Sequence, residues 1–187
     1  LRQRGYLAGV LHNFTWPSGA LLTSQFSYRT LDMDLLPHSY EIYRLGVETA
    51  AGGFFSRQNR RTDRIEWREV YAPQPLAGWG RHQLKAGWEF VRNAFDGRQV
   101  LSPVEVLRAS GSPAERILFS SAGTARIRQR EYSAFFQDKW TPHPRVTFDA
   151  GLRLDRDSVS EEGHAAPRAG FAITPFAGQR TVIRGGV

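Results

Sequence analysis

A two-residue alternation of apolar and polar side chains runs through residues 129–187 and constrains the fold more than any other feature. It recurs in the stretches QREYSAFFQDKW, VTFDAGLRLDRD and PRAGFAITPF, which are separated by a tight proline-containing turn and a longer polar loop. Successive side chains of a strand point to opposite faces of a sheet, so the middle stretch predicts one apolar and one charged face. Its apolar positions are Val146, Phe148, Ala150, Leu152 and Leu154, and they alternate with Thr147, Asp149, Gly151, Arg153 and Asp155.

The apolar runs are too short for membrane-spanning helices. Such a helix needs roughly 18 consecutive apolar residues, and no run in the 187-residue chain approaches that length. No amino-terminal basic segment is followed by an apolar stretch and a cleavage site. A barrel strand needs only about 9–11 alternating residues, so these patterns exclude a helical membrane protein and leave a β-barrel open.

The basic excess limits the choice of partners only weakly. The chain has 25 Lys+Arg against 18 Asp+Glu, and nearly all of these cations are arginines. Arginine pairs with carboxylates and phosphates, so the excess suits anionic lipid head groups, nucleic acid or an acidic solute, although codon usage in a GC-rich genome also produces it. The segment RQNRRTDR continues into a strand with an apolar face and has no nucleic-acid-binding signature beside it. We therefore expect it to contact lipopolysaccharide or acidic loops, and we expect no nucleic-acid partner.

Connections of two lengths alternate along the chain. Outer-membrane barrels have short turns on one side and long loops on the other, whereas a soluble meander has no reason to sort its connections. The pattern predicts an all-β fold, an antiparallel transmembrane β-barrel wall of about eight strands. The tight turns lie near residues 16–19, 73–80, 141–145 and 176–179, and the longer polar loops near 34–56, 96–128 and 157–166. The loop at residues 96–128 is expected to carry a small hairpin.

The ordered series of segments resembles a known family. EYSAFFQDKWTPHPRVTFDAGLRLDRD, PRAGFAITPF and TVIRGGV are similar to the carboxy-terminal half of the barrel of a TonB-dependent outer-membrane receptor. The similarity is greatest to the large acidobacterial type with a carboxypeptidase-regulatory-like domain, which GGFFSRQNRRTDRIEWREVY and HQLKAGWEF also resemble. Leu154 stands where the family more often has tyrosine, and the chain stops at Val187 in mid-strand without the usual terminal aromatic residue.

The resemblance implies a barrel of about 22 strands, closed by a plug and energised through the TonB complex of the inner membrane. We expect residues 1–187 to be a partial barrel domain, with the plug and the amino-terminal regions absent. About eight strands would not close such a barrel, so edge strands would be exposed. The expected location is the outer membrane of a Gram-negative bacterium, and the expected partners are its lipid and lipopolysaccharide, the plug, the TonB complex and an unidentified solute.

The two faces of the alternating strands predict two sets of functional residues. Aromatic rings near strand ends suit an interfacial girdle, and charged residues would cost several kcal/mol if they faced lipid, so we expect them to face the lumen. The predicted girdle is Trp67, Tyr71, Trp88, Tyr132 and Trp140. The predicted lumen-facing residues are Lys85, Glu89, Glu131, Gln137, Lys139, Asp149, Arg153 and Asp155.

No pattern in the sequence indicates catalysis. Asp149, Asp155 and Asp157 share a strand face, but no histidine or nucleophile stands at a motif spacing beside them. The five histidines are scattered and there is no cysteine, so we expect no catalytic residue, no metal site and no cofactor. The leading hypothesis is a non-enzymatic receptor for active uptake of a large or scarce solute. The alternatives are a soluble or secreted β-sandwich binding module and a passive porin.

Overall fold

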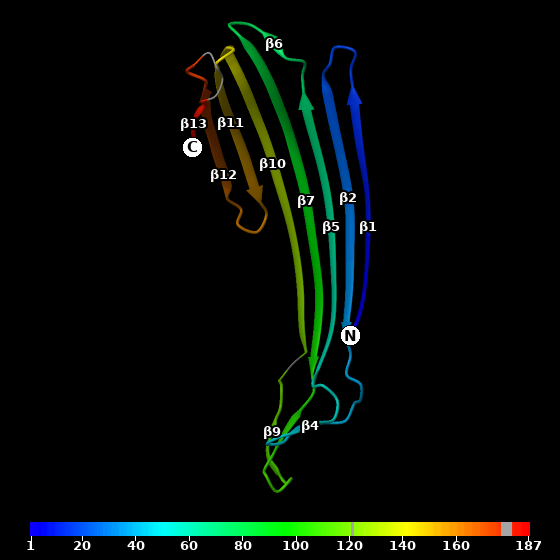
Figure 1. The fold of residues 1–187 in the computed structure, drawn as a ribbon. Coiled ribbons are helices and arrows are strands. Elements are labelled where there is room, and N and C mark those ends of the chain that lie inside the picture. Colours follow the sequence, from blue (N-terminus) through cyan, green and yellow to red (C-terminus); the bar gives the residue numbers. More distant parts are fainter. Residues whose placement is uncertain (121, 177–180) are drawn as a thin grey trace. The chain divides into compact units, whose positions relative to one another are not determined.

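A computed structural model describes residues 1–120, 122–176 and 181–187, and every regular element within these ranges is a strand (Figure 1). This confirms the all-β prediction. These residues contain no helix that is long and apolar enough to cross a membrane. The long strands are β1 (Arg2–Thr15), β2 (Leu21–Leu35), β5 (Ser56–Ala72), β7 (Arg81–Leu101), β10 (Gly123–His143), β11 (Val146–Asp157) and β12 (Gly163–Ile173). The short strands are β3 (Tyr43–Leu45), β4 (Ala50–Ala51), β6 (Leu76–Ala77), β8 (Val104–Leu107), β9 (Pro113–Ile117) and β13 (Ile183–Gly186).

The main sheet follows the order of the chain. Its hydrogen-bonded neighbours run β1-β2-β5-β7-β10-β11-β12-β13, and β6 pairs only with β7. Eight strands on this path match the predicted number of about eight. Within the described residues β1 and β13 are the two ends of the path and do not pair with each other, so the sheet is open.

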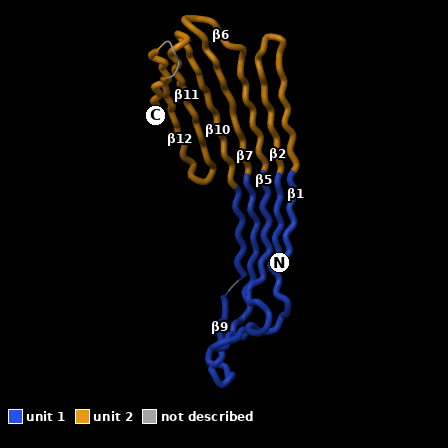
Figure 2. The backbone as a smooth tube through the Cα atoms, viewed as in Figure 1, with its two compact units in different colours: residues 1–7, 29–64, 93–128 blue, residues 8–28, 65–92, 129–187 orange. Residues whose placement is uncertain are grey.

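The chain divides into two compact units (Figure 2). Unit 1 comprises residues 1–7, 29–64 and 93–128, and unit 2 comprises residues 8–28, 65–92 and 129–187. Strands β1, β2, β5, β7 and β10 each contribute one part to each unit. The short connections β1–β2, β5–β7 and β10–β11 all belong to unit 2, whereas the long connections β2–β5 and β7–β10 belong to unit 1. Connections are thus sorted by length, as the sequence predicted, except that the β11–β12 loop also lies in unit 2.

Unit 1 holds a second, small sheet made by the long connections. Its order is β4-β3-β8-β9, and β3 pairs with β8 in parallel, so the two connections are joined by backbone hydrogen bonds. The hairpin β8–β9 is the one predicted within residues 96–128. The predicted length of that loop was wrong, because β7 continues to Leu101 and β10 begins at Gly123. Residues 93–101 mix apolar and polar side chains on both faces and residues 123–128 are rich in arginine, so neither strand end continues the alternation of its strand.

Two other predicted connections were also too long. Strand β10 continues to His143, so the turn predicted at residues 141–145 contains only Pro144 and Arg145 between strands. The polar loop predicted at residues 157–166 shortens to Ser158–Glu162, because β12 starts at Gly163. Most of the turn predicted at residues 176–179 lies outside the described residues.

The strand register in unit 2 separates apolar from polar side chains. Tyr132 lies opposite Arg156 and Trp140 opposite Phe148 in the β10–β11 pair, while Phe148 lies opposite Phe171 in the β11–β12 pair. Opposite residues of antiparallel strands share a face. The resulting apolar face contains Tyr132, Ala134, Phe136, Asp138, Trp140, Phe148, Ala150, Leu152, Leu154, Arg156, Ala165, Pro167, Ala169 and Phe171. The polar face contains Glu131, Ser133, Phe135, Gln137, Lys139, Asp149, Gly151, Arg153, Asp155, Asp157, His164, Ala166, Arg168 and Gly170.

Phe135 is an aromatic residue on the polar face, and a glycine on the neighbouring strand makes room for its ring. A Cβ built on Gly87 of β7 would lie 2.7 Å from Cε1 of Phe135 and 2.6 Å from the carbonyl oxygen of Glu69. The phenyl ring therefore lies directly against the backbone at Gly87. An aromatic ring over a strand glycine covers backbone that would otherwise be exposed and fixes the register of the two strands.

We predict that Gly87→Ala lowers the free energy of unfolding by about 1–3 kcal/mol, because the added methyl group displaces the Phe135 ring or the β5 backbone. Urea titration followed by tryptophan fluorescence measures the change. The matched control is Gly123→Ala in β10, where an added Cβ meets no atom within 4 Å. Equal destabilisation by both substitutions would contradict the ring-over-glycine contact.

Candidate functional site

The polar face of unit 2 gathers all eight residues that the sequence predicted to face a lumen. Lys139 lies opposite Asp149, and Glu131 opposite Asp157, in the β10–β11 register. Glu89 of β7 joins this face through an ion pair with Arg153 of β11, and Lys85 has the same parity in its strand. The structure therefore places together Lys85, Glu89, Glu131, Gln137, Lys139, Asp149, Arg153 and Asp155. That this face lines a lumen stays a prediction.

Arg153 is the centre of a hydrogen-bonded network on this face. Its Nε donates to both carboxylate oxygens of Asp155 at 2.9 and 3.0 Å, and its Nη2 donates to Oγ of Ser133 at 2.9 Å. The same Nη2 lies 3.7 Å from a carboxylate oxygen of Glu89, and Ser133 donates to Asp155 at 2.5 Å. One guanidinium therefore joins three neighbouring strands, which makes a structural role for Arg153 and Asp155 better supported than direct solute binding.

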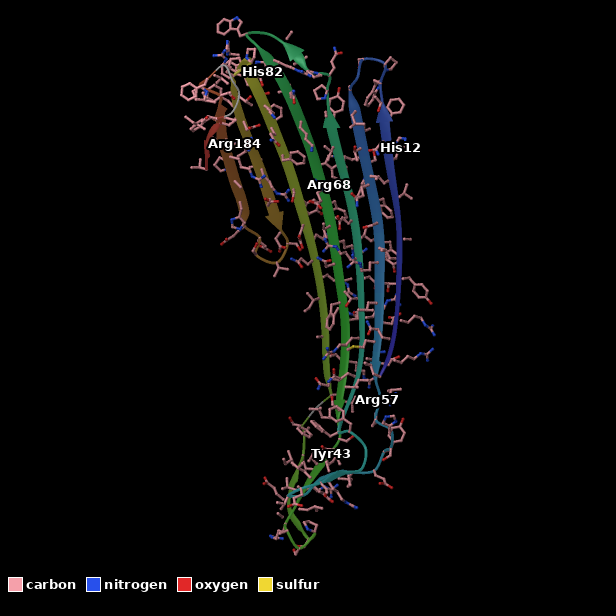
Figure 3. The ribbon with its side chains drawn as sticks, in the orientation of Figure 1. His12, Tyr43, Arg57, Arg68, His82 and Arg184 are labelled. Carbon is pink, nitrogen blue, oxygen red and sulfur yellow. The ribbon has the colours of Figure 1, made fainter. Side chains whose placement is uncertain are left out.

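Beside this network, the polar face carries cations without carboxylate partners. A hollow of about 190 Å³ lies on this face. It is lined by Arg68, Lys85, Gln137, Arg153 and Arg168, together with Phe135, Phe136 and Leu152. Within the part of the chain that the structure describes, Arg68, Lys85 and Arg168 make no ion pair or side-chain hydrogen bond. Figure 3 labels Arg68 on β5. Fixed positive charges in a concave surface favour an anionic group.

The opposite face carries the five aromatic residues predicted for a girdle, joined by further rings. Trp67 and Trp88 contact each other with centroids 5.0 Å apart, and Phe90 lies 5.2 Å from Tyr132. Nearer the short turns, Tyr71 meets Trp16 at 5.9 Å, and Trp140 lies between His82 and Phe148. The girdle residues thus fall into two groups, one beside the turns and one farther along the strands. Their role at a membrane interface stays a prediction.

An acidic residue interrupts the apolar face, and a histidine accounts for it. Asp138 has apolar neighbours in its register, and one of its carboxylate oxygens lies 2.7 Å from Nδ1 of His82. The His82 ring stacks on Trp140 with an interplanar angle of 9°. Figure 3 labels His82. The other carboxylate oxygen of Asp138 is buried and has no hydrogen-bond partner among the described residues. His82 was not predicted as a site residue, because only the register brings it beside Asp138.

Asp157 ends β11 and organises the loop that follows it. Gln129 donates to one of its oxygens at 2.5 Å, and the backbone N–H groups of Val159 and Ser160 donate to the other. The carboxylate therefore acts as a local cap for the loop, as Asp side chains commonly do in turns.

Two of the carboxylates on the polar face are held by neighbouring groups. The described residues contain no group of three or more histidine, aspartate or glutamate side chains that could hold a metal ion. The carboxylates Asp149, Asp155 and Asp157 share the polar face, but Asp155 is held by Arg153 and Asp157 by its loop. Arg68 and Arg168 were not predicted as site residues. Each stands at a polar position of the alternation in its strand, β5 or β12, and that position was the available signal.

Comparisons with known proteins agree with this geometry. The family model described as TonB dependent receptor-like, beta-barrel matches residues 2–182. Among solved structures, the outer membrane transporter YddB from Escherichia coli is similar, with a TM-score of 0.78 and 18% sequence identity. The match covers 98% of this chain and 25% of that transporter, so this chain spans about a quarter of that protein's length and the match shows the fold alone. A search of curated proteins found no match.

We predict that His82 and Asp138 are energetically coupled. Replacing His82 by Phe keeps a ring on Trp140 but leaves the Asp138 carboxylate without its partner on an apolar face, so this variant should be destabilised. Adding Asp138→Leu removes the unpaired group and should restore part of the loss. A double-mutant cycle from urea titrations in lipid vesicles should give a coupling energy of about 0.5–3 kcal/mol, and strictly additive effects would contradict the pair.

Proposed function

The chain belongs to the TonB-dependent receptor-like β-barrel family, and we propose from this premise that it forms part of the wall of an outer-membrane transport receptor. The family implies a location in the outer membrane of a Gram-negative bacterium and points to a transporter rather than an enzyme. The observation that carries the proposal is the separation of apolar and charged residues onto the two faces of β10, β11 and β12. Such a sheet suits lipid on one side and water on the other.

The physical reason is the cost of placing charge in hydrocarbon. The Arg153 network and the unpartnered cations Arg68, Lys85 and Arg168 would each face a penalty of about 2–4 kcal/mol toward lipid near the midplane. Toward water they are solvated without cost. Leu152, Leu154 and Phe171, all substantially exposed, have the opposite preference. The single orientation that satisfies both faces places the polar one toward an aqueous lumen.

We propose that a plug outside this chain gates the lumen and that the inner-membrane TonB system energises uptake. Residues 1–187 would be one segment of the barrel domain, of the type that carries a carboxypeptidase-regulatory-like domain. The solute would be large or scarce, such as an oligosaccharide, a peptide or a metal chelate. Its first contacts would be made by the connections within residues 34–56, 96–128 and 157–166, because binding residues concentrate in loops on a rigid sheet.

The orientation of the sheet predicts which side chains meet lipid. The chain contains no cysteine, so single cysteines can be introduced at Ala134 on the apolar face and Gln137 on the polar face. A small fluorophore is attached to each variant in denaturant, and the intact barrel protein is then refolded into vesicles. Brominated acyl chains should quench the label at residue 134 strongly and that at residue 137 little. Equal quenching at both residues would contradict the proposed orientation and favour a soluble sandwich.

Energised transport predicts a shared growth defect. Deleting the receptor gene from its source bacterium should abolish growth on one nutrient class in a panel of oligosaccharides, peptides and metal chelates at limiting concentration. Deleting the energy-transducing protein should abolish growth on the same class to the same degree, because the plug stays closed without it. Growth that depends on the receptor but survives loss of the energy-transducing protein would support the passive porin alternative.

A further inference from the structure

Three arginines lie in a row on the apolar face, just beyond its aromatic residues. Arg156 lies opposite Tyr132 in the β10–β11 register, and Arg130 precedes Tyr132 by two residues in β10. Arg92 stands two residues after Phe90, whose ring contacts Tyr132. All three side chains are exposed and, within the described residues, make no ion pair or side-chain hydrogen bond.

The β7–β10 register brings Arg92 next to Arg130. His82 stacks on Trp140, Phe90 contacts Tyr132 and Phe135 covers Gly87, and these pairs are all explained by one uninterrupted antiparallel register. Continuing that register by two residues places Arg92 opposite Arg130. Adjacent strands lie about 4.8 Å apart, so the three arginines span about 10 Å across β7, β10 and β11.

An apolar groove leads away from this arginine row. Its volume is about 510 Å³, and its apolar lining consists of Trp88, Tyr132, Ala134, Leu154 and Ala165. Arg156 also lines it, as do Glu89, Ser133, Asp155 and His164, which belong to the polar positions of their strands. The small side chains of Ala134 and Ala165 leave room between the larger ones. Tyr132 and Leu154 are each 50% exposed along the groove, so it is open to whatever surrounds this face.

A second hollow continues the groove past Tyr132 and Arg156. It encloses about 540 Å³ and is also lined by Arg130, Ser158 and Glu161. Asp157 lines it as well, but Gln129 and the loop N–H groups already occupy that carboxylate. Arg130 and Arg156 therefore balance the charges of Asp157 and Glu161 in this hollow, and the exposed Arg92, which does not line it, adds the excess positive charge of the arginine row.

We propose that this groove binds a phosphate-bearing lipid of the outer leaflet, with its phosphate on Arg92, Arg130 and Arg156 and an acyl chain along Trp88, Tyr132 and Leu154. The proposal rests on the proposed function, because it requires the apolar face to meet lipid. Guanidinium groups bind phosphate through paired, charge-assisted hydrogen bonds. A free phosphate ion would use only the arginines, whereas a lipid also covers the adjoining apolar groove, so the continuity of the two hollows favours the lipid.

The test measures binding of diphosphorylated lipid A to the intact barrel protein in detergent micelles. The variant R92Q/R130Q/R156Q should bind at least about tenfold more weakly than the wild type, because several charge-assisted hydrogen bonds are lost. The control R68Q/K85Q/R168Q removes the same charge from the opposite face and should retain wild-type lipid affinity. Retention of electrophoretic heat-modifiability reports that each variant is folded, and R156Q and R130Q alone serve if the triple variant does not fold.

Three outcomes would overturn the proposal. Equal weakening by both triple variants would indicate a general charge effect. Unchanged binding of dephosphorylated lipid A would show that the arginines do not hold a phosphate. Full competition by millimolar inorganic phosphate would identify a free-anion site. The fluorophore experiment on residues 134 and 137 reports the orientation of the sheet separately, so failure of lipid binding with that orientation intact affects this inference alone.

Discussion

The pairing of backbone groups across antiparallel strands is the constraint on which the structure of unit 2 depends. Each strand must satisfy its N–H and C=O groups through its neighbours, and this pairing sets which residues lie opposite one another. Because opposite residues share a face, the register of β10, β11 and β12 collects nearly all charges on one side and nearly all apolar groups on the other. A shift of one residue in any strand would turn its charged side chains toward the apolar face.

Residues that break the alternation show how strongly the register is held. Phe135 on the polar face lies against Gly87, and Asp138 on the apolar face is paired with His82. Both of these residues are compensated by a residue on β7 that lies at least 48 positions earlier in the chain. Such compensation across strands stabilises one pairing over its alternatives, since slipping β7 against β10 would break both contacts at once.

The cationic side chains of the two faces differ in their position and in their partners. On the polar face Arg153 is held by Glu89 and Asp155, and Arg68, Lys85 and Arg168 surround it without partners. On the apolar face the arginines stand only beyond the aromatic residues, where a charged head group and an acyl chain would meet. Unpartnered positive charge in unit 2 therefore lies on both faces, around the Arg153 network on the polar face and beyond the aromatic residues on the apolar face.

The sequence by itself determined the fold class, the approximate number of strands and the division of side chains between two faces, because an alternation of two residues is a local property of each strand. It also located the hairpin within residues 96–128, although the ends of β7 and β10 escaped notice because the alternation of these strands does not continue there. Only the tertiary structure decided which residues meet across strands: Glu89 with Arg153, His82 with Asp138, and Gly87 with Phe135. These neighbours depend on register between segments far apart in the chain, and the alternation within any one strand leaves that register open.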